Sequence, residues 1–193
     1  MSAEGDTTPC DIILETDRMK VRTWSEENRK HFLSLYLNPD VTALIGGPFN
    51  EDTVNSRYEL ELKSFREHGF QYYPVFLKEC DIFIGCCGVR QYCGGSTDHE
   101  DSTNDMLELG FHFHPAYWGR GYATEAAVAM SSYAVERLGA ETLFAGHNPG
   151  NSASKRCLEK IGFTYVRDEF YPPTGLMHPS YMLKKSRVRD LTT

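Results

Sequence analysis

The sequence predicts a single α/β (α+β) domain, with a mixed and mostly antiparallel sheet of about seven strands flanked by four helices. Two observations lead to this prediction. Short runs with the two-residue alternation of strands lie between segments whose apolar residues recur at helical spacing. The chain has 193 residues, the size of one domain, and can bury a core without disulfides or metals. We therefore expect one domain over residues 11–185.

The first part of the chain is predicted to form a strand and two helices. Residues 1–10 show no pattern and are expected to be disordered, and residues 12–22 alternate loosely like a strand. Ser25 is a typical N-cap, so a helix is predicted from there to Leu37, followed by a loop over 38–50. A second helix has apolar residues on one face and ends at a glycine; these residues are Val54, Tyr58, Leu62, Phe65 and Gly69.

The middle of the chain predicts three more strands. Residues 72–78 and 82–91 are rich in β-forming residues and are separated by a short polar turn, as in an antiparallel hairpin. Residues 93–105 include two adjacent glycines and four acidic residues, which predicts a mobile polar loop. Residues 106–114 form the next predicted strand, the fourth of the sheet.

The last part of the chain alternates helices and strands. A helix is predicted over 121–138, where small alanines allow close packing on a sheet, and Gly139 follows it. The remaining elements are a strand at 142–145, a helix at 152–161 that ends at Gly162, and strands at 163–170 and 181–185. Residues 186–193 are expected to form a C-terminal tail.

Composition narrows the range of partners. The chain has 20 Lys and Arg against 27 Asp and Glu, a net charge of −7, which argues against nucleic acid or an anionic membrane as a partner. No apolar run has the length of a signal peptide or a membrane span, so we expect a cytoplasmic protein. A monomer or a homodimer is expected.

The six cysteines are interpreted as reduced thiols, because a cytoplasmic chain of this size does not need disulfides. Cys86, Cys87 and Cys93 lie near His99 but lack the paired C-x2-C spacing of a zinc site. His112 and His114 share one face of a predicted strand, and no third ligand stands at recognisable spacing. We favour packing roles for both histidines over a base or metal ligands, and we expect no metal.

The most informative segment runs from Glu108 to Glu125, where a strand leads through a glycine-containing turn into a helix. Gly119 and Gly121 leave room for a ligand to approach the backbone, and the first amides of the helix would point at a phosphate group. The segment matches neither the dinucleotide pattern G-x-G-x-x-G nor the P-loop pattern G-x-x-x-x-G-K-[ST]. Taken alone, a glycine pair before a helix is more often a simple turn.

Here the sequence resembles the GNAT superfamily of N-acyltransferases, whose pyrophosphate loop follows the pattern [QR]-x-x-G-x-[GA] after the fourth strand. Residues 118–123, Trp-Gly-Arg-Gly-Tyr-Ala, fit except that Trp118 stands where the family usually has Gln or Arg. The run Tyr-Trp-Gly-Arg-Gly-Tyr-Ala-Thr-Glu-Ala is similar to the branch that includes the ribosomal-protein N-terminal (alanine/serine) acetyltransferases. Residues 147–163 support this, because they match that branch's N-P-x-N-x-x-S and L-x-K-x-G-F patterns.

The resemblance implies that the fourth and fifth strands splay apart and that acetyl-CoA, the cosubstrate, lies in the opening. Main-chain groups near 111–113 would pair with the pantetheine amides. The diphosphate would rest on the turn at 119–124, with positive charge from Arg120 or Arg156. The implied cofactor-binding residues are Phe111, His112, Phe113, Trp118, Gly119, Arg120, Gly121, Tyr122, Ala123, Thr124, Asn148, Asn151, Ser154 and Arg156.

Acyl transfer to an amine needs a base for the amine, a donor for the oxyanion and a proton for the leaving thiolate. Strand alternation places Glu108 on one face with Gly110 and His112, where its carboxylate could accept the amine proton; an ordinary strand glutamate is the alternative. A backbone N–H near His112 is the expected oxyanion donor. The resemblance implies that Asn151 contacts pantetheine or the amine and that Ser154 protonates the thiolate, although both are also typical helix caps.

The sequence therefore predicts an acetyl-CoA-dependent N-acetyltransferase, with Glu108, Ser154 and Asn151 as candidate catalytic residues and a protein N-terminus or small amine as acceptor. A polyamine, aminoglycoside or other small-molecule acetyltransferase is the alternative among enzymes. A non-catalytic acyl-CoA sensor would keep the glycine turn but would not need a carboxylate at 108. The acceptor wall is expected from the loop at 38–50, the second helix and the hairpin near residues 171–178.

Overall fold

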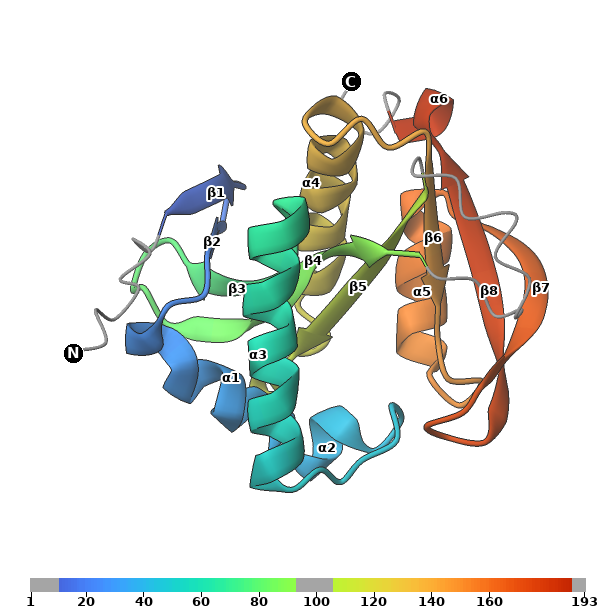
Figure 1. The fold of residues 1–193 in the computed structure, drawn as a ribbon. Helices are drawn as coiled ribbons and strands as arrows, with labels where there is room; N and C mark the ends of the chain where they lie inside the picture. The colour runs from blue at the N-terminus through green and yellow to red at the C-terminus, as the bar shows by residue number, and fades with distance from the viewer. Residues whose placement is uncertain (1–10, 93–105, 189–193) are drawn as a thin grey trace.

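The computed structural model describes residues 11–92 and 106–188, which form one mixed sheet with helices on both faces (Figure 1). The sheet has eight strands in the order β1-β2-β3-β4-β5-β6-β8-β7, and β5 pairs with β6 in parallel. The predicted α/β (α+β) architecture with a mixed, mostly antiparallel sheet is confirmed. The disorder expected for residues 1–10 and the loop expected at 93–105 lie outside the described residues.

The strand predicted over residues 12–22 is in fact a hairpin, so the sheet has eight strands rather than seven. Its arms are β1 (Ile12–Glu15) and β2 (Met19–Arg22). Thr16 closes the turn between them, because its amide donates to the carbonyl of Met19 at 2.9 Å and its hydroxyl accepts from the amide of Met19 at 2.9 Å. Apolar spacing alone did not reveal this turn, since both arms of a hairpin alternate.

The next helices are η1 (Glu26–Asn28), α1 (Arg29–Tyr36), α2 (Pro39–Thr42) and α3 (Glu51–His68). Both predicted helices are present, and α3 ends at Gly69, whose φ of 78° is in the left-handed region. The loop predicted at 38–50 contains the single turn α2, which sequence analysis missed. Asn38 caps this turn by accepting from the amide of Asp40 at 2.9 Å, and a proline occupies its first position.

The central elements are β3 (Tyr72–Leu77), β4 (Phe83–Gln91), β5 (Met106–Phe113), η3 (Pro115–Tyr117), α4 (Tyr122–Glu136) and β6 (Thr142–Gly146). The last are α5 (Ser152–Ile161), β7 (Thr164–Tyr171), β8 (Leu176–Lys184) and α6 (Lys185–Val188). β8 begins five residues earlier than the predicted 181 because its first half pairs with β7. Six α-helices therefore occur in the described ranges instead of four, and the additional α2 and α6 are single turns.

Two apolar clusters lie on opposite faces of the sheet. α4 and α5 cover one face, where Ala126, Met130 and Ala134 are buried against the sheet. α1 and α3 cover the other face, with Phe32 and Tyr58 in its core. Figure 1 shows α3 in front of the central strands and α4 behind them. The small residues of α4 allow the close approach that the sequence predicted.

β5 and β6 lie side by side only where they begin. Their pairing joins residues 106–108 to residues 142–144 and then ends. From Leu109 to Phe113, β5 stays paired with β4, whereas β6 continues along β8. The two strands therefore separate after Glu108, as the resemblance implied, and one edge of β5 loses its neighbour.

Candidate active site

A cavity of about 830 Å³ fills the opening between β5 and β6. Its inner lining comes from β5, the turn before α4, the end of β6 and the first turns of α5. Farther out, α2, α3 and the β7–β8 hairpin line the same cavity. The segments expected to bind the donor and those expected to form the acceptor wall therefore share one space.

The backbone of β5 presents alternate residues to this cavity. On the side of β4, the amide of His114 donates to the carbonyl of Ile84 at 2.9 Å, and the carbonyl of Met106 accepts from the amide of Tyr92 at 3.4 Å. The β4–β5 register is continuous, without a bulge. Even-numbered residues therefore bond to β4, and odd-numbered ones face the opening. An oxyanion donor near His112 is then the amide of an odd-numbered neighbour.

Trp118, the departure from the family pattern, has a defined contact in the structure. Its indole Nε1 donates to the carbonyl of Phe113 at 2.6 Å, while 53% of the residue stays exposed. This bond uses the last cavity-facing carbonyl of β5. Both main-chain groups of Phe111 and the amide of Phe113 are therefore left to face a ligand.

The turn before α4 has the geometry of an anion site. Gly119 and Gly121 have φ values of 73° and 80°, in the region that favours glycine, and a Cβ at Gly119 would meet no atom within 4 Å. The first helical bond runs from the amide of Glu125 to the carbonyl of Gly121 at 3.0 Å. The amides before Glu125 have no acceptor within the helix, so they are available to phosphate oxygens.

The start of α5 forms the facing wall. Asn151 caps this helix by accepting from the amide of Ser154 at 3.0 Å, and Asn148 accepts from the amide of Gly150 at 2.9 Å. Each asparagine uses its carbonyl oxygen in this way, so its NH2 group is the part that could contact a ligand. Ser154 is half-buried and lines the cavity.

Glu108 lies at the inner end of the opening. Its neighbours across the sheet are Arg90 on β4 and Phe144 on β6. Burial raises the pKa of Glu108, the positive charge of Arg90 opposes this, and the negative charge of Glu169 adds to it, with a raised pKa as the result. A carboxyl group with a raised pKa is better matched to proton transfer near neutral pH than an ordinary glutamate.

His112 and His114 are neutral packing residues. Burial, followed by the charges of Arg90 and Arg57, lowers the pKa of His112 to about 3. Its ring packs against Tyr36 and Tyr72, with centroids 5.5 and 6.1 Å away. Burial also lowers the pKa of His114, which packs edge-on against Phe83. With a pKa of about 3, the imidazole of His112 is too weak a base to accept a proton from an amine at neutral pH.

The outer part of the cavity lies where the acceptor wall was expected. The loop after α2 contributes Leu44 and Ile45, α3 contributes Arg57, and the β7–β8 hairpin contributes Tyr171. The loop and the hairpin touch across the cavity, because a Cβ built on Gly46 would lie 2.8 Å from Pro173. This contact joins the two segments that were expected to form the acceptor wall.

All but one of the residues predicted to bind the donor line the cavity, together with Glu108. The exception is Arg120, whose guanidinium lies over the ring of Tyr117 at 5.8 Å. Sequence analysis missed Arg90, Tyr92, Glu169 and Lys160, which also line the cavity. Arg90 lies near the end of β4, Tyr92 directly follows that strand, and Glu169 belongs to β7, so only the strand register brings them towards Glu108.

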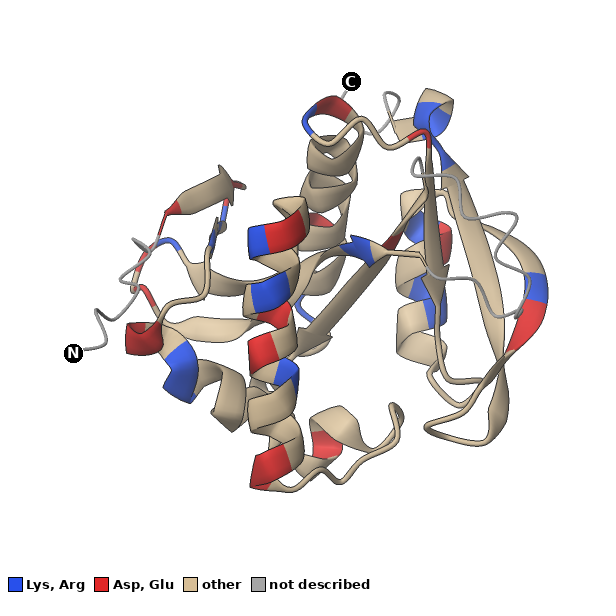
Figure 2. Ribbon diagram, in the orientation of Figure 1, with Lys and Arg blue, Asp and Glu red and all other residues tan. Residues whose placement is uncertain are grey.

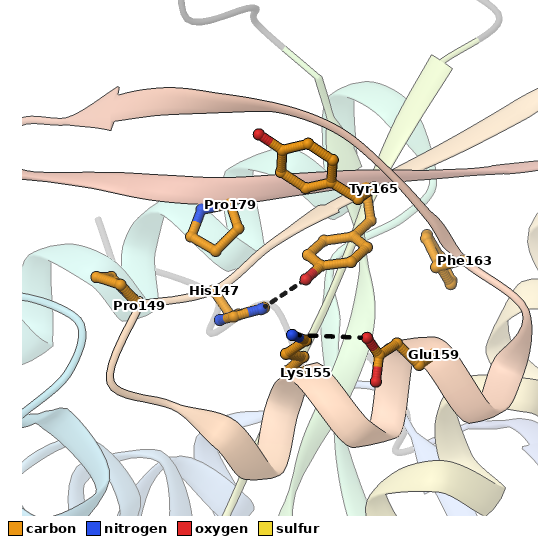
Figure 3. A pocket seen from close by; sticks show the side chains of 8 residues that line it. His147, Pro149, Lys155, Glu159, Phe163, Tyr165 and Pro179 are labelled. Atoms are coloured by element: carbon orange, nitrogen blue, oxygen red, sulfur yellow. Dashed lines mark hydrogen bonds and ion pairs between the residues drawn. The ribbon is translucent and has the colours of Figure 1, made fainter.

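A second, smaller hollow of about 380 Å³ lies between α5 and the β7–β8 hairpin (Figure 3). His147 stacks on Tyr181 with ring centroids 5.4 Å apart, and its Nε2 lies 3.3 Å from the Tyr181 hydroxyl. Lys155 and Glu159 face each other along α5 at 3.8 Å. His147 lines both this hollow and the large cavity, so it forms part of the wall between them.

The cysteines of the described ranges are free. Cys86, Cys87 and Cys157 are buried, and Cys80 is exposed. Among residues 11–92 and 106–188, no three or more His, Cys, Asp or Glu side chains gather as a metal site would require. In the same ranges, no helix has the length and apolar character needed to cross a membrane.

The separation of β5 from β6 frees main-chain groups of β5, and the start of α4 lies next to them with free amides. Together they suit a long ligand that has both amide and phosphate groups. This arrangement is that of a transferase that uses an acyl-coenzyme A. The family model of the acetyltransferase (GNAT) domain matches residues 18–164, about three quarters of the chain. The chain belongs to this family and is an acetyl-CoA-dependent N-acetyltransferase.

Two relatives align with most of the chain. YkkB of Bacillus subtilis (strain 168) is 28% identical over 155 residues, which span 80% of this chain and 86% of YkkB. The FsC-acetyl coenzyme A-N(2)-transacetylase of Aspergillus fumigatus is 29% identical over 171 residues, 84% of this chain and 71% of that enzyme. The name of the fungal enzyme fits membership of the acetyltransferase family.

A solved structure of RimL, the ribosomal L7/L12 α-N-protein acetyltransferase, in complex with coenzyme A has the same fold. Its TM-score is 0.73 at 13% identity, over 90% of this chain and 98% of the RimL chain. The branch that the two sequence motifs indicated is thus among the structural neighbours. At this identity the likeness concerns the fold alone.

Proposed function

We propose that the large cavity binds acetyl-CoA and a primary amine next to each other and that the amine attacks the thioester directly. The separation of β5 from β6 after Glu108 carries this proposal. It frees the main chain of β5 for the pantetheine arm and leaves a half-buried carboxylate, that of Glu108, at the inner end of the cavity.

The diphosphate of the donor would lie on the amides at the start of α4, at the positive end of the helix dipole. Arg156 and Lys160 of α5 line the cavity and can supply charge that the acidic chain otherwise lacks. Figure 2 shows basic residues along the ribbon of α5. Of the two arginines considered from the sequence, Arg156 is therefore favoured over Arg120.

Glu108 would accept the proton of the attacking amine, directly or through a water molecule. Attack requires the neutral amine, and most primary amines are protonated near pH 7. The carbonyl oxygen of the thioester would receive a hydrogen bond from a cavity-facing amide of β5, such as that of Phe111. Both of these groups belong to β5.

The thiolate of coenzyme A needs a proton or a hydrogen-bond donor as it leaves. Ser154 lines the cavity at the first turn of α5, and its amide is bonded to Asn151. We assign the hydroxyl of Ser154 as the donor to the sulfur and the NH2 group of Asn151 as a contact for pantetheine or the amine. A Ser154→Ala variant should therefore lose kcat more than affinity for acetyl-CoA.

The acceptor is proposed to be a protein N-terminus or a small amine, and relatives represent both classes. RimL acts on the α-amine of a ribosomal protein, and the fungal relative acts on the N(2) position of FsC.

A thiol-release screen tests this function. The protein is incubated with acetyl-CoA and a panel of N-terminal peptides, polyamines, aminoglycosides and simple amines, and coenzyme A release is followed. Turnover with at least one amine, confirmed by mass of the acetylated product, is expected. Binding of acetyl-CoA by calorimetry with no turnover across the panel would instead favour an acyl-CoA sensor.

A further inference from the structure

Arg18 lies in the turn between β1 and β2, but its side chain reaches the start of α4, more than one hundred residues away in sequence. Nε donates to a carboxylate oxygen of Glu125 at 2.6 Å, and Nη1 donates to the carbonyl of Arg120 at 3.0 Å. The guanidinium also lies over the ring of Tyr122 at 4.4 Å. One side chain thus contacts three residues of the segment proposed to bind the diphosphate.

Glu125 is an ionised carboxylate in the first turn of α4. It accepts from the hydroxyl of Thr16 at 2.6 Å and from the amide of Arg18 at 3.1 Å, in addition to the guanidinium. Burial acts to raise the pKa of Glu125, but the hydrogen bonds from Thr16 and Arg18 outweigh it, and the pKa is lowered. Without a cation beside it, this charge would repel a diphosphate bound at the same helix end.

The bond from Arg18 to the Arg120 carbonyl has a second consequence. In a trans peptide, the carbonyl of one residue and the amide of the next point in opposite directions. Holding the Arg120 carbonyl against Arg18 therefore turns the amide of Gly121 away from Arg18. Gly121 has a left-handed backbone conformation, with a φ of 80°, and a glycine backbone is flexible. The bond from Arg18 to the Arg120 carbonyl therefore helps to fix the orientation of the Gly121 amide.

We propose that Arg18 is a positioning residue for the donor: it neutralises Glu125 and fixes the turn whose amides bind the diphosphate of acetyl-CoA. Arg18 does not line the cavity, so it acts through the turn and not by touching the donor. The inference rests on the proposed function, because it requires the diphosphate to lie at the start of α4.

A truncated donor separates this role from a purely structural one. S-acetylpantetheine carries the thioester and the amide arm of acetyl-CoA but no diphosphate. For Arg18→Gln, kcat/KM with acetyl-CoA should fall on the order of tenfold, mainly through KM, whereas kcat/KM with S-acetylpantetheine should change by less than about twofold. Arg18→Lys should lie between Arg18→Gln and the native protein, because it keeps the charge but not the two directed bonds.

Arg22 offers a matched control in the same hairpin. It forms a comparable pair with Asp81, at 2.6 and 3.0 Å, and its guanidinium lies over the ring of Phe76 on β3 rather than at the start of α4. Arg22→Gln should leave the ratio of the two kcat/KM values unchanged even if the melting temperature falls. The double variant Arg18→Gln with Glu125→Gln should recover part of the lost kcat/KM with acetyl-CoA, because the Glu125 carboxylate that repels the diphosphate is gone.

Equal losses with both donors in Arg18→Gln would overturn the proposal and leave Arg18 as a structural tie between the β1–β2 turn and α4. A double variant no better than Arg18→Gln would overturn the electrostatic part. Calorimetry of native protein with acetyl-CoA distinguishes these failures from failure of the proposed function, which would show as no binding at all and would overturn both.

Discussion

Glu108 on β5 lies directly opposite Arg90 on β4, and Arg90 is ion-paired with a second carboxylate, the buried Glu61 of α3. Glu61 also accepts from the amide of Tyr72 at 2.9 Å, and the guanidinium of Arg90 lies 3.9 Å from the centroid of the Tyr72 ring. One arginine therefore stands between two carboxylates. It is bonded to Glu61 and acts on Glu108 through its charge, which opposes the effect of burial.

Removing Arg90 should destabilise the fold, because Glu61 would then be a buried charge without its partner. Arg90→Gln should lower the free energy of unfolding by about 3–5 kcal/mol, measured by urea denaturation. The double variant Arg90→Gln with Glu61→Gln should recover much of this loss, since it removes both charges and the amide oxygen introduced by Glu61→Gln can still accept from the amide of Tyr72. Equal destabilisation in the single and double variants would contradict a dominant charge effect.

The same double variant should shift the pH profile. Glu108 must be deprotonated to act as a base, so kcat/KM rises with pH through its pKa. Arg90 lowers that pKa against the effect of burial, so loss of Arg90 leaves it higher. The acidic limb of the profile should therefore move to higher pH in the double variant, and it should not do so in Glu61→Gln, which keeps Arg90. If the acidic limb of the double variant lay at the same pH as that of the native protein, Glu108 would be excluded as the titrating group.

The fold could be predicted largely from local patterns. Strand alternation, helical spacing and glycine stops located α1, α3, α4, α5 and most strands. The errors came from features that apolar spacing does not encode. The turn at Thr16 lies between two arms that both alternate, and the first half of β8 is defined by pairing with β7 around a turn near Pro172.

The site was predicted only where a continuous motif describes it. The turn at residues 119–124 and the start of α5 are each a continuous stretch of sequence, and residues of both line the cavity. Arg18 and Arg90 reach the same region from the β1–β2 turn and β4, through contacts that join residues far apart in the chain. Single residues of this kind carry no local signal, because their partners are set by sheet register and turn geometry.

Gly121→Val should weaken acetyl-CoA binding, because a side chain at this position would press on Arg18 and strain the turn whose amides are proposed to bind the diphosphate. Within the protein, a Cβ at Gly121 would meet only the guanidinium of Arg18, at 3.5 Å. The left-handed backbone also adds strain of about 1–2 kcal/mol. Gly139→Val is the matched control, with φ of 75° and no atom within 4 Å of its Cβ. Calorimetry with acetyl-CoA should show a loss of affinity in Gly121→Val but not in Gly139→Val. If both variants bound acetyl-CoA as tightly as the native protein, the diphosphate would have to bind elsewhere.

The cysteines should be dispensable for folding. Burial raises the pKa of Cys86 to about 12, and that of Cys87 is raised for the same reason, so these thiols stay protonated and unreactive at neutral pH. A reducing agent together with a chelator should leave the melting temperature nearly unchanged. Stoichiometric zinc in the purified protein, or a large fall in melting temperature, would show that cysteines outside the described ranges take part in a bridge or metal site.

Glu108→Gln is the sharpest test of the proposed mechanism. The substitution keeps the shape of the side chain and removes its basicity, while the amine acceptor remains mostly protonated at neutral pH. Because Glu108 lies at the inner end of the groove, where the pKa of its carboxyl is raised by burial, kcat/KM at pH 7 should fall on the order of 10² to 10⁴. Affinity for acetyl-CoA should stay nearly the same, since the proposed donor site lies along the free edge of β5 and the turn before α4.

The loss should shrink towards high pH, where the free amine no longer needs a base. Glu169→Gln is the matched control, because Glu169 lines the same cavity but is already bonded to Tyr92 at 2.8 Å and paired with Arg167 at 2.7 Å. Its removal should lower the pKa of Glu108 and move the acidic limb to lower pH without a comparable loss of rate. Near-native turnover of Glu108→Gln at pH 7 with a verified acceptor would assign proton removal to another group or to bulk water.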